Sequence, residues 1–251
     1  MYHSITIGNK NTWTDWHLIP ASRPLVNPPS VKTNFIEIPG ADGTLDLTES
    51  LSGRAMYGDR TGQWTFYVDN GHGSWASIYS EIMSYLHGKN LTAVLEDDPF
   101  FYYEGRFSVN QWLSEASNSK IVINYEVGPY KLYSITDGDL WLWDPFSFET
   151  GVIKSYRNLK VNGVVPLVIY IDGDTLDVVP TITANYTATG WGLYMYYGNN
   201  QYRLEKGNNI FEDVVIHEGS NRLEFRFSRI SQSSEQNPKA TITIKLIGGR
   251  L

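Results

Sequence analysis

The amino-acid sequence predicts a mainly β protein made of two domains. Most of its apolar residues alternate with polar ones at the two-residue period of a half-buried strand. Only one stretch repeats apolar residues at the spacing of three and four that a helix requires. Aromatic residues make up 14% of the chain, which favours sheets and extensive interfaces, and 251 residues are enough for two domains of ordinary size.

The first domain is expected to be a β domain with a single helix. Strands are predicted where apolar residues alternate, over residues 2–8, 13–19, 31–38, 44–48, 64–68, 91–96, 103–112 and 120–127. The helix is predicted over residues 75–87, with Ser74 as its N-cap and Gly88 as its C-terminal stop. No helical pattern follows, so we place the boundary near residue 133, which gives domains 1–132 and 133–251.

Residues 29–60 are expected to form a long hairpin. The strand over residues 31–38 ends in two turn signals, of which Asp42-Gly43 is typical of a type I′ hairpin turn. A second strand over residues 44–48 leads into a polar loop that ends on Asp59-Arg60. Prolines at positions 20, 24, 28 and 29 predict an extended connector before the hairpin, because proline donates no ladder hydrogen bond.

The second domain is expected to be all β. Its strands are short and recur about every ten residues, over residues 156–161, 167–171, 176–179, 181–184, 191–197, 202–204, 214–216, 222–227 and 240–246. Turn signals such as Asn162-Gly163 and Gly207-Asn208-Asn209 separate them, and residues 228–238 read as a polar loop. This pattern is typical of a β-sandwich or jelly roll.

The composition excludes several classes of function. With no cysteine, the chain has no disulfide, thiolate metal site or cysteine nucleophile. Residues 1–130 carry 8 Lys and Arg against 14 Asp and Glu, a net charge of −6, which argues against binding of nucleic acid through phosphate contacts. No run of about 18 apolar residues occurs, so no membrane insertion is expected. The N-terminus lacks a signal-peptide pattern, so we expect a soluble protein made in the cytoplasm.

No catalytic residue, metal site or cofactor is predicted. The five histidines include no pair at the i, i+4 spacing of two zinc ligands on a helix. Asp97-Asp98-Pro99 and Asp172-Gly173-Asp174 could be paired carboxylates or calcium ligands, but adjacent acids do not face each other and no closing glutamate follows, so turns are favoured. The glycine motifs of hydrolases and nucleotide-binding proteins are absent.

Aromatic residues are the remaining candidates for binding. Tyr194 and Tyr196 share one face of a predicted strand and could stack on sugar rings if that face is exposed. The alternative, which we favour, is that the whole strand is buried in the sandwich. Trp141, Trp143 and Phe146 could contact a partner subunit, although a structural role between the domains is favoured.

Three spaced segments carry a resemblance to a known family. They are DWHLIPASRP at residues 15–24, PSVKT at residues 29–33 and IPGADGTLDLTESLSGRAMYGDR at residues 38–60. In this order they resemble the distal tail protein family of siphophages, the phages with long non-contractile tails, and of prophages. The resemblance is dense in the first half of the chain and general in the second.

The resemblance implies a structural protein of the virion tail tip, or baseplate, and no enzyme. It implies an N-terminal domain related to tail-tube subunits that forms a homohexameric ring, and a C-terminal galectin-like sandwich. The implied partners are the chain itself, the tail tube protein, the tail-associated hub protein, and receptor-binding proteins or host surface glycans. Because a closed ring needs two complementary patches on each subunit, we expect Arg54, Tyr57, Asp59 and Arg60 to contact a neighbour.

Two other functions stay open from the residues alone. The first is a carbohydrate-binding module whose C-terminal sandwich binds cell-wall glycans through Tyr194 and Tyr196. The second is a glycan-cleaving enzyme, which would need two facing carboxylates.

Overall fold

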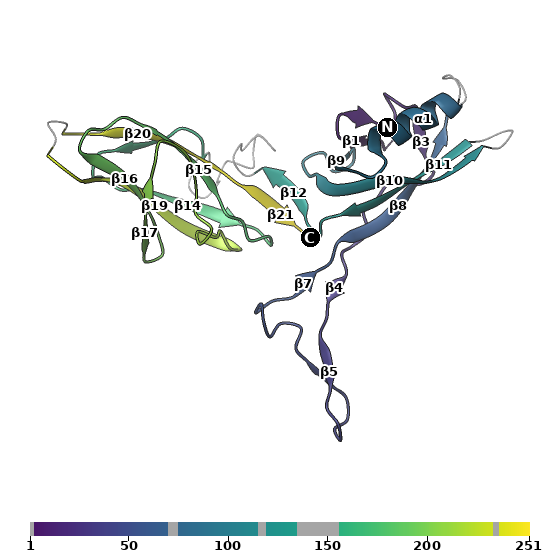
Figure 1. Cartoon of the computed structure of the whole chain (residues 1–251), viewed down its shortest axis with the longest axis horizontal. Helices are drawn as coiled ribbons and strands as arrows, with labels where there is room; N and C mark the ends of the chain where they lie inside the picture. The colour runs from purple at the N-terminus through teal and green to yellow at the C-terminus, as the bar shows by residue number, and fades with distance from the viewer. Residues whose placement is uncertain (1–2, 70–74, 115–118, 135–155, 233–235) are drawn as a thin grey trace. The chain divides into compact units, whose positions relative to one another are not determined.

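The computed structural model describes residues 3–69, 75–114, 119–134, 156–232 and 236–251 (Figure 1). The chain divides into two compact units, one of Met1–Lys131 with Leu251 and one of Leu132–Arg250. Strands dominate both units, and α1 (Trp75–Leu86) is the helix found in the described residues. The predicted mainly β class is therefore confirmed. Each unit is described by itself below.

The first unit is built on a seven-stranded antiparallel sheet. Its strands are β1 (Ile5–Ile7), β2 (Lys10–Asn11), β3 (Leu18–Pro20), β8 (Arg60–Val68), β9 (Lys89–Leu95), β10 (Tyr103–Ser114) and β11 (Ser119–Val127). They are hydrogen-bonded in the order β2-β1-β9-β10-β11-β8-β3. The register of β10 on β11 shifts between Val109 and Gln111, so Asn110 forms a bulge. After the bulge the alternation of β10 is reversed, and Trp112 packs against the core.

Helix α1 packs against one face of this sheet (Figure 1). Its stripe of apolar residues buries Ile82 and Leu86 completely, against sheet residues that include Phe66 and Phe107. The helix ends at Leu86, and Gly88 just after it has a φ of +75° and donates its N–H to the carbonyl oxygen of Phe107. The predicted helix and its glycine stop are confirmed, whereas Ser74 lies outside the described residues.

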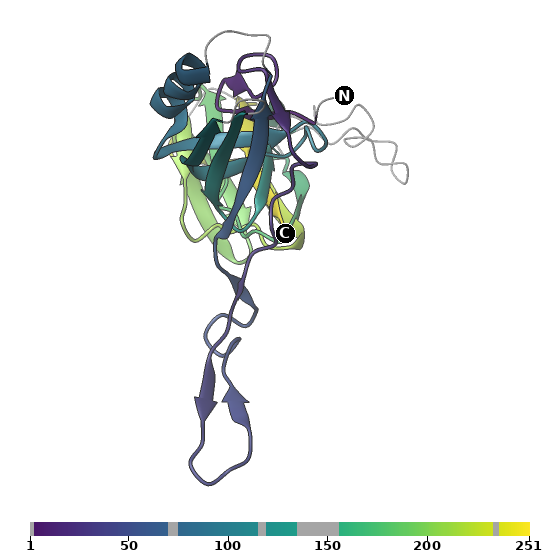
Figure 2. The same cartoon turned by 90° about the vertical axis from the view of Figure 1, so that its right-hand side faces the viewer.

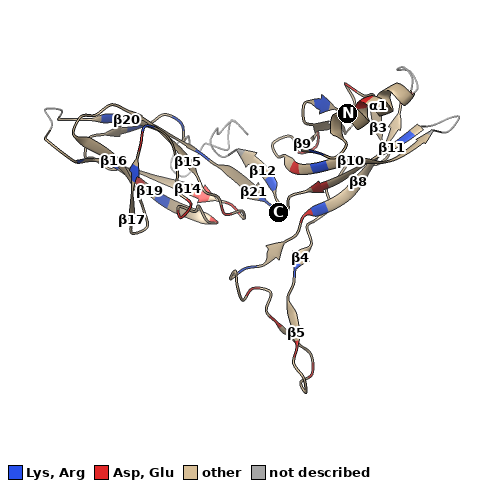
Figure 3. Cartoon of the chain, viewed as in Figure 1, with Lys and Arg blue, Asp and Glu red and all other residues tan. Residues whose placement is uncertain are grey.

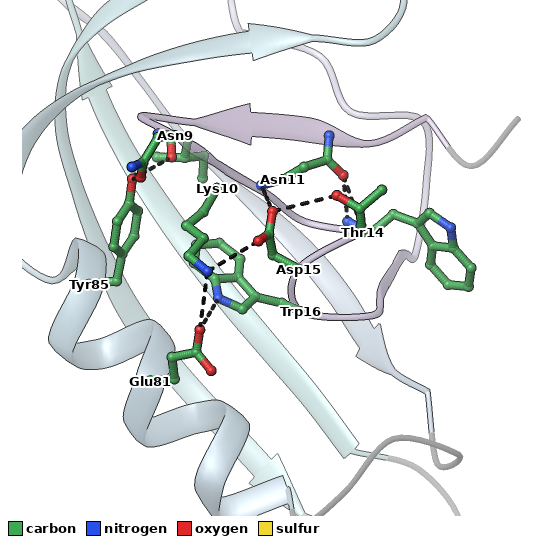
Figure 4. A network of polar contacts seen from close by, with 10 residues as sticks. Asn9, Lys10, Asn11, Thr14, Asp15, Trp16, Glu81 and Tyr85 are labelled. Carbon is green, nitrogen blue, oxygen red and sulfur yellow. Dashed lines mark hydrogen bonds and ion pairs between the residues drawn. The ribbon is translucent and has the colours of Figure 1, made fainter.

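The strand predicted over residues 13–19 is confirmed only at residues 18 and 19, which begin β3, because residues 12–16 form a turn. Asn11 and Asp15 hold this turn: the side-chain oxygen of Asn11 accepts the N–H of Trp13, and the carboxylate of Asp15 accepts the N–H of Asn11. Such side-chain bonds to the backbone compete with strand pairing. Figure 4 shows that the same turn is joined to α1. Glu81 on the helix accepts a hydrogen bond from the Trp16 indole and forms an ion pair with Lys10.

The hairpin also differs from its prediction. The run over residues 31–38 is interrupted, giving β4 (Val31–Lys32) and β5 (Phe35–Glu37), and β7 (Met56–Tyr57) lies in the predicted polar loop. Strand β4 pairs with β7, and β5 pairs with β6 (Thr44–Asp46). The last pair, Glu37 with Thr44, leaves a six-residue loop in which only Gly40 and Gly43 have positive φ. A type I′ turn requires positive φ at Asp42 as well, so that prediction is wrong.

The second unit is a sandwich of two four-stranded sheets. One sheet has the order β13-β20-β15-β18, with β13 (Leu159–Asn162), β20 (Lys239–Lys245), β15 (Thr181–Tyr186) and β18 (Gly207–Ile210). The other has the order β14-β19-β16-β17, with β14 (Leu167–Gly173), β19 (Gly219–Arg229), β16 (Trp191–Tyr197) and β17 (Asn200–Leu204). Strands β12 (Lys131–Ser134) and β21 (Ile247–Arg250) form a separate pair.

The inward residues of the two sheets form one core. Phe225, Phe227, Leu193, Ile242 and Ile244 are each at most 1% exposed within it. The strands predicted over residues 176–179 and 214–216 are reduced to a single bridge between Val178 and Ile216. Strand β18 was predicted as a turn, and β19 extends two residues, Ser228 and Arg229, into the loop predicted over residues 228–238.

Candidate interaction surfaces

The hairpin of residues 31–59, which we call the arm, projects from the sheet of the first unit (Figure 2). It consists of two short ribbons in sequence, β4–β7 and β5–β6. Every residue from 30 to 46 is exposed. A two-stranded ribbon with both faces in water is at best marginally stable, so the arm buries too little of its own surface to be held by its own contacts.

Large apolar side chains lie on both faces of the arm. Phe35 is 55% exposed and its neighbour Ile36 is 46% exposed, although they point to opposite sides of β5. Leu45, paired with Ile36 across the ribbon, is 47% exposed, and Leu51 is 98% exposed. Exposed apolar side chains gathered on one element mark a surface that another molecule covers.

The arm is acidic as well as apolar. Glu37, Asp42, Asp46 and Glu49 outnumber the basic residues of residues 31–55, which are Lys32 and Arg54 (Figure 3). A partner surface that covers the arm must therefore bury apolar groups and offer positive charge at the rim.

The base of the arm is held rigidly by the sheet. The Trp64 indole N–H donates to the carbonyl oxygen of Leu25 at 2.8 Å, and the Tyr125 hydroxyl accepts the N–H of Asn27 at 2.9 Å. Gly62 makes room for this hydroxyl, because a Cβ at that position would lie 2.2 Å from it. The connector before the arm is thus extended, as the prolines predicted, and tied to β8 and β11.

Arg60, predicted to contact a neighbouring subunit, is instead buried at this base. Its side chain is 6% exposed; Nε donates to the carbonyl oxygen of Pro129 at 2.8 Å and Nη1 to that of Asn27 at 3.2 Å. The guanidinium lies 5.6 Å from the ring centre of Tyr103. Arg60 begins β8 rather than ending a loop, so its side chain points into the core side of the sheet and joins the two ends of the arm.

The other three predicted interface residues lie nearer the surface. Asp59 is exposed, and Arg54 and Tyr57 are half-buried. The Tyr57 ring meets the Tyr130 ring edge to face, with centroids 6.3 Å apart. These residues stay candidates for an interface that involves the root of the arm.

The face of the seven-stranded sheet opposite α1 is polar and reaches solvent. Thr61 and Gln63 on β8, Asn124 and Glu126 on β11 and Arg106 and Ser108 on β10 line a depression that crosses these three strands. Lys120 and Glu104 point to the same side, so positive and negative charges are balanced there. The sequence analysis made no prediction about this face, because its residues are the polar ones between the core residues of each strand and carry no motif of their own.

In the second unit, β16 has one buried face and one half-buried face. Trp191, Leu193 and Met195 are at most 8% exposed, whereas Tyr194 and Tyr196 are half-buried on the outer side. The favoured prediction that the whole strand is buried is therefore wrong for the outer face. The outer face of β16 is not fully open either, because the guanidinium of Arg226 lies over the Tyr196 ring, 4.5 Å from its centre.

The acidic pairs singled out in the sequence are engaged in ion pairs. Asp97 accepts hydrogen bonds from Arg23 Nε at 2.7 Å and His3 Nδ1 at 2.9 Å, and those bonds lower the pKa of Asp97. Asp98 pairs with Lys131 at 2.9 Å. Both carboxylates are therefore held by basic side chains.

Asp174 of the second acidic sequence is a structural bridge. It accepts hydrogen bonds from the Tyr133 hydroxyl at 2.9 Å, from the N–H of Thr175 at 2.8 Å and from Arg250 Nε. It thereby fastens β12 and β21 to the loop after β14. Burial and the bond to Asp174 raise the pKa of Tyr133 to about 12.

Neither a metal site nor a membrane-spanning helix is seen in the part of the chain that the structure describes. Within those residues, no three His, Asp or Glu side chains gather closely enough to hold a metal ion. No described helix is long and apolar enough to cross a membrane. Trp141, Trp143 and Phe146 lie outside the described residues.

These features define a class of protein: a β unit with one helix and a projecting arm, followed in the chain by a β-sandwich. Among solved structures, the chain is similar to the crystal structure of the SPP1 Dit (gp 19.1) protein, described there as a paradigm of the hub adsorption apparatus in phages that infect Gram-positive bacteria. The TM-score is 0.57, the sequence identity is 10%, and the match covers 100% of both chains. No protein-family model and no curated protein matches the sequence. At this identity, the likeness shows a shared fold.

Proposed function

We propose that this chain is a structural protein of a phage tail tip, a distal tail protein without enzymatic activity. In this proposal the first unit forms a homohexameric ring that joins the tail tube protein on one side to a tail-associated hub protein on the other. The second unit offers an attachment point at the periphery for a receptor-binding protein or a host glycan. The fold shared over the full length with a phage hub protein supports this role.

The arm is the main observation that supports a ring. It exposes apolar side chains on both faces and has too few internal contacts to be stable alone. A head-to-tail ring supplies the missing contacts, because the arm of every subunit then packs on one neighbour while the subunit receives the arm of the other neighbour. The occupant of the arm surface is thus a second copy of this chain, with Arg54, Tyr57 and Asp59 at the edge of the contact.

The polar face of the seven-stranded sheet is assigned to the central opening. Its balanced charges and its hydroxyl and amide side chains bind a polyphosphate chain weakly, because tight non-specific binding requires an excess of Lys and Arg. A DNA molecule could therefore slide past this face.

Substitutions on the arm test the proposal. Fully burying a side chain of this size contributes about 1.5 to 3 kcal/mol, and Phe35, Ile36 and Leu45 are each about half exposed. Burying the rest contributes roughly 1 kcal/mol per residue, so changing all three to Ser should weaken each subunit contact by about 3 kcal/mol, or more than 100-fold. Light scattering as a function of concentration measures the loss.

The matched control is a triple variant in which exposed apolar residues of the second unit are changed to Ser: Val164, Val165 and Ile210, which are 58%, 69% and 62% exposed. It should assemble as the unaltered chain does. At a concentration too low for assembly, urea unfolding should be the same for both triple variants, because neither set contributes to a core. Equal assembly by the arm variant and the control would reject the role given to the arm.

A further inference from the structure

The two outer faces of the second unit differ in chemistry. The face of β14-β19-β16-β17, here called the arginine–tyrosine face, includes Tyr170, Tyr194, Tyr196, Arg203, Arg222, Glu224 and Arg226, and Asp172 and Glu205 lie on the same side. The face of β13-β20-β15-β18, here called the lysine–threonine face, carries Lys160, Lys239, Lys245, Thr181, Thr183, Thr241 and Thr243. Arg and Tyr are enriched in protein interfaces and Lys is depleted, so the first face has the composition of an interface and the second that of a solvated surface.

Along β19, one acid holds two arginines in place. Glu224 is only 14% exposed and accepts a hydrogen bond from Arg222 Nη2 at 2.6 Å, while Arg226 Nε lies 3.7 Å from its other oxygen. The two arginine side chains stay 50% and 40% exposed. Their guanidinium groups are thus fixed at one side and open at the other. Fixing an arginine in advance lowers the entropy that a bound carboxylate has to overcome.

The tyrosines of this face are arranged to support the arginines rather than to receive a sugar. Arg226 lies over the Tyr196 ring at 4.5 Å and covers that side of the ring. The Tyr194 ring folds over Gly192, where an added Cβ would come within 2.8 Å of a ring carbon. Arg226 Nε is buried and faces Glu224 at 3.7 Å, beyond hydrogen-bond distance. Because the side chain is nevertheless 40% exposed, its Nη groups are the part of the guanidinium left for an incoming carboxylate.

We propose that the arginine–tyrosine face docks a protein partner through a cluster of Asp and Glu side chains. Glu224 draws the guanidinium groups of Arg222 and Arg226 together, one at each of its oxygens, so they fit two neighbouring carboxylates of a protein surface, each held by two parallel N–H bonds. The inference deepens the proposed function and rests on it, since the second unit is there the attachment point for another tail component. It names the chemistry of that component.

The test measures binding of labelled poly-L-glutamate to the full-length chain by fluorescence anisotropy. Changing Arg222 and Arg226 to Ser should weaken binding about tenfold or more, because both anchors at the centre of the face are lost. Changing both to Lys keeps the charge but removes the planar fork, and should weaken binding about threefold or more. Changing Lys160 and Lys239 to Ser removes the same charge from the opposite face and should alter binding by less than about twofold.

Several results would overturn the proposal. They are the absence of saturable binding by the unaltered chain, an equal loss in the Lys160 and Lys239 variant, and full binding by the Arg-to-Lys variant. Tighter binding of hyaluronate, a carboxylated glycan, at equal carboxylate concentration would assign the face to a glycan instead. Circular dichroism verifies that each variant is folded. Because the assay does not require rings, a chain that binds poly-L-glutamate as expected but never assembles would refute the proposed function and leave this inference standing.

Discussion

Replacing Arg60 by Met tests the structural role that the base of the arm gives to this residue. The variant keeps most of the aliphatic stem and removes the hydrogen bonds to the carbonyl oxygens of Pro129 and Asn27. Hydrogen bonds to a charged group contribute about 1.5 to 3 kcal/mol each. The substitution also removes Nη2, which is buried without a partner among the described residues. Losing this unsatisfied group should raise the free energy of unfolding by about 1 to 3 kcal/mol and so offset part of the loss.

The balance is a loss of roughly 2 kcal/mol in the free energy of unfolding of the first unit. Urea unfolding followed by tryptophan fluorescence measures it, since Trp64 lies in the same strand as Arg60. The matched control is Arg106→Met, on the exposed face of the same sheet, for which we expect a loss below about 1 kcal/mol. If Arg60→Met unfolds like the unaltered chain but fails to assemble, Arg60 is an interface residue and the reasoning is refuted.

Two further predictions concern stability. Gly105→Ala should destabilise the first unit by about 1 to 3 kcal/mol in thermal unfolding, because the added Cβ would lie 2.1 Å from the carbonyl oxygen of Glu126 on the neighbouring strand. Gly128→Ala is the control and should be tolerated, because the atom nearest to its added Cβ is 3.9 Å away. The pKa of Tyr133 is raised to about 12, so its contribution to stability is complete below pH 10 and is lost as the pH rises from 10 to 12. Tyr133→Phe should lose the bond to Asp174 at neutral pH and show a smaller further loss over this range, measured by the urea midpoint; an unchanged pH dependence would contradict the raised pKa.

Periodicity was enough to predict the fold class and the elements that face a core. Alternation over residues 120–127 and 191–197 marks strands whose inner side chains are buried, and the apolar stripe of residues 75–87 marks the helix that covers the sheet. These elements are predictable because burial requires the pattern, whatever the neighbours are.

The elements that failed are those held by side chains close in sequence. The run over residues 13–19 has strand-like alternation, yet Asn11 and Asp15 bond the backbone and form a turn. In the arm, Asn34 donates its N–H to the Thr48 hydroxyl, which interrupts strand pairing at the point in the chain between β4 and β5. Alternation alone does not reveal such bonds.

The sequence located the segments that form the candidate interaction surfaces but not the contacts of their side chains. The arm was recognised from its turns and its resemblance to a family, while the burial of Arg60 depends on Pro129, a residue 69 positions later. The outer position of Tyr194 and Tyr196 follows from strand parity, but the cover that Arg226 gives Tyr196 comes from strand pairing with β19. Contacts of this range require the tertiary structure.

The central claim is that the first unit closes into a ring of six. Electron microscopy of the purified full-length chain at high concentration, with light scattering for the mass, tests it most directly. The account predicts particles with six-fold symmetry, a central opening and six times the mass of one chain, which dissociate when the apolar residues of the arm are changed to Ser. Closed particles of another symmetry, or a chain that stays monomeric at every concentration and in the presence of tail tubes, would contradict it.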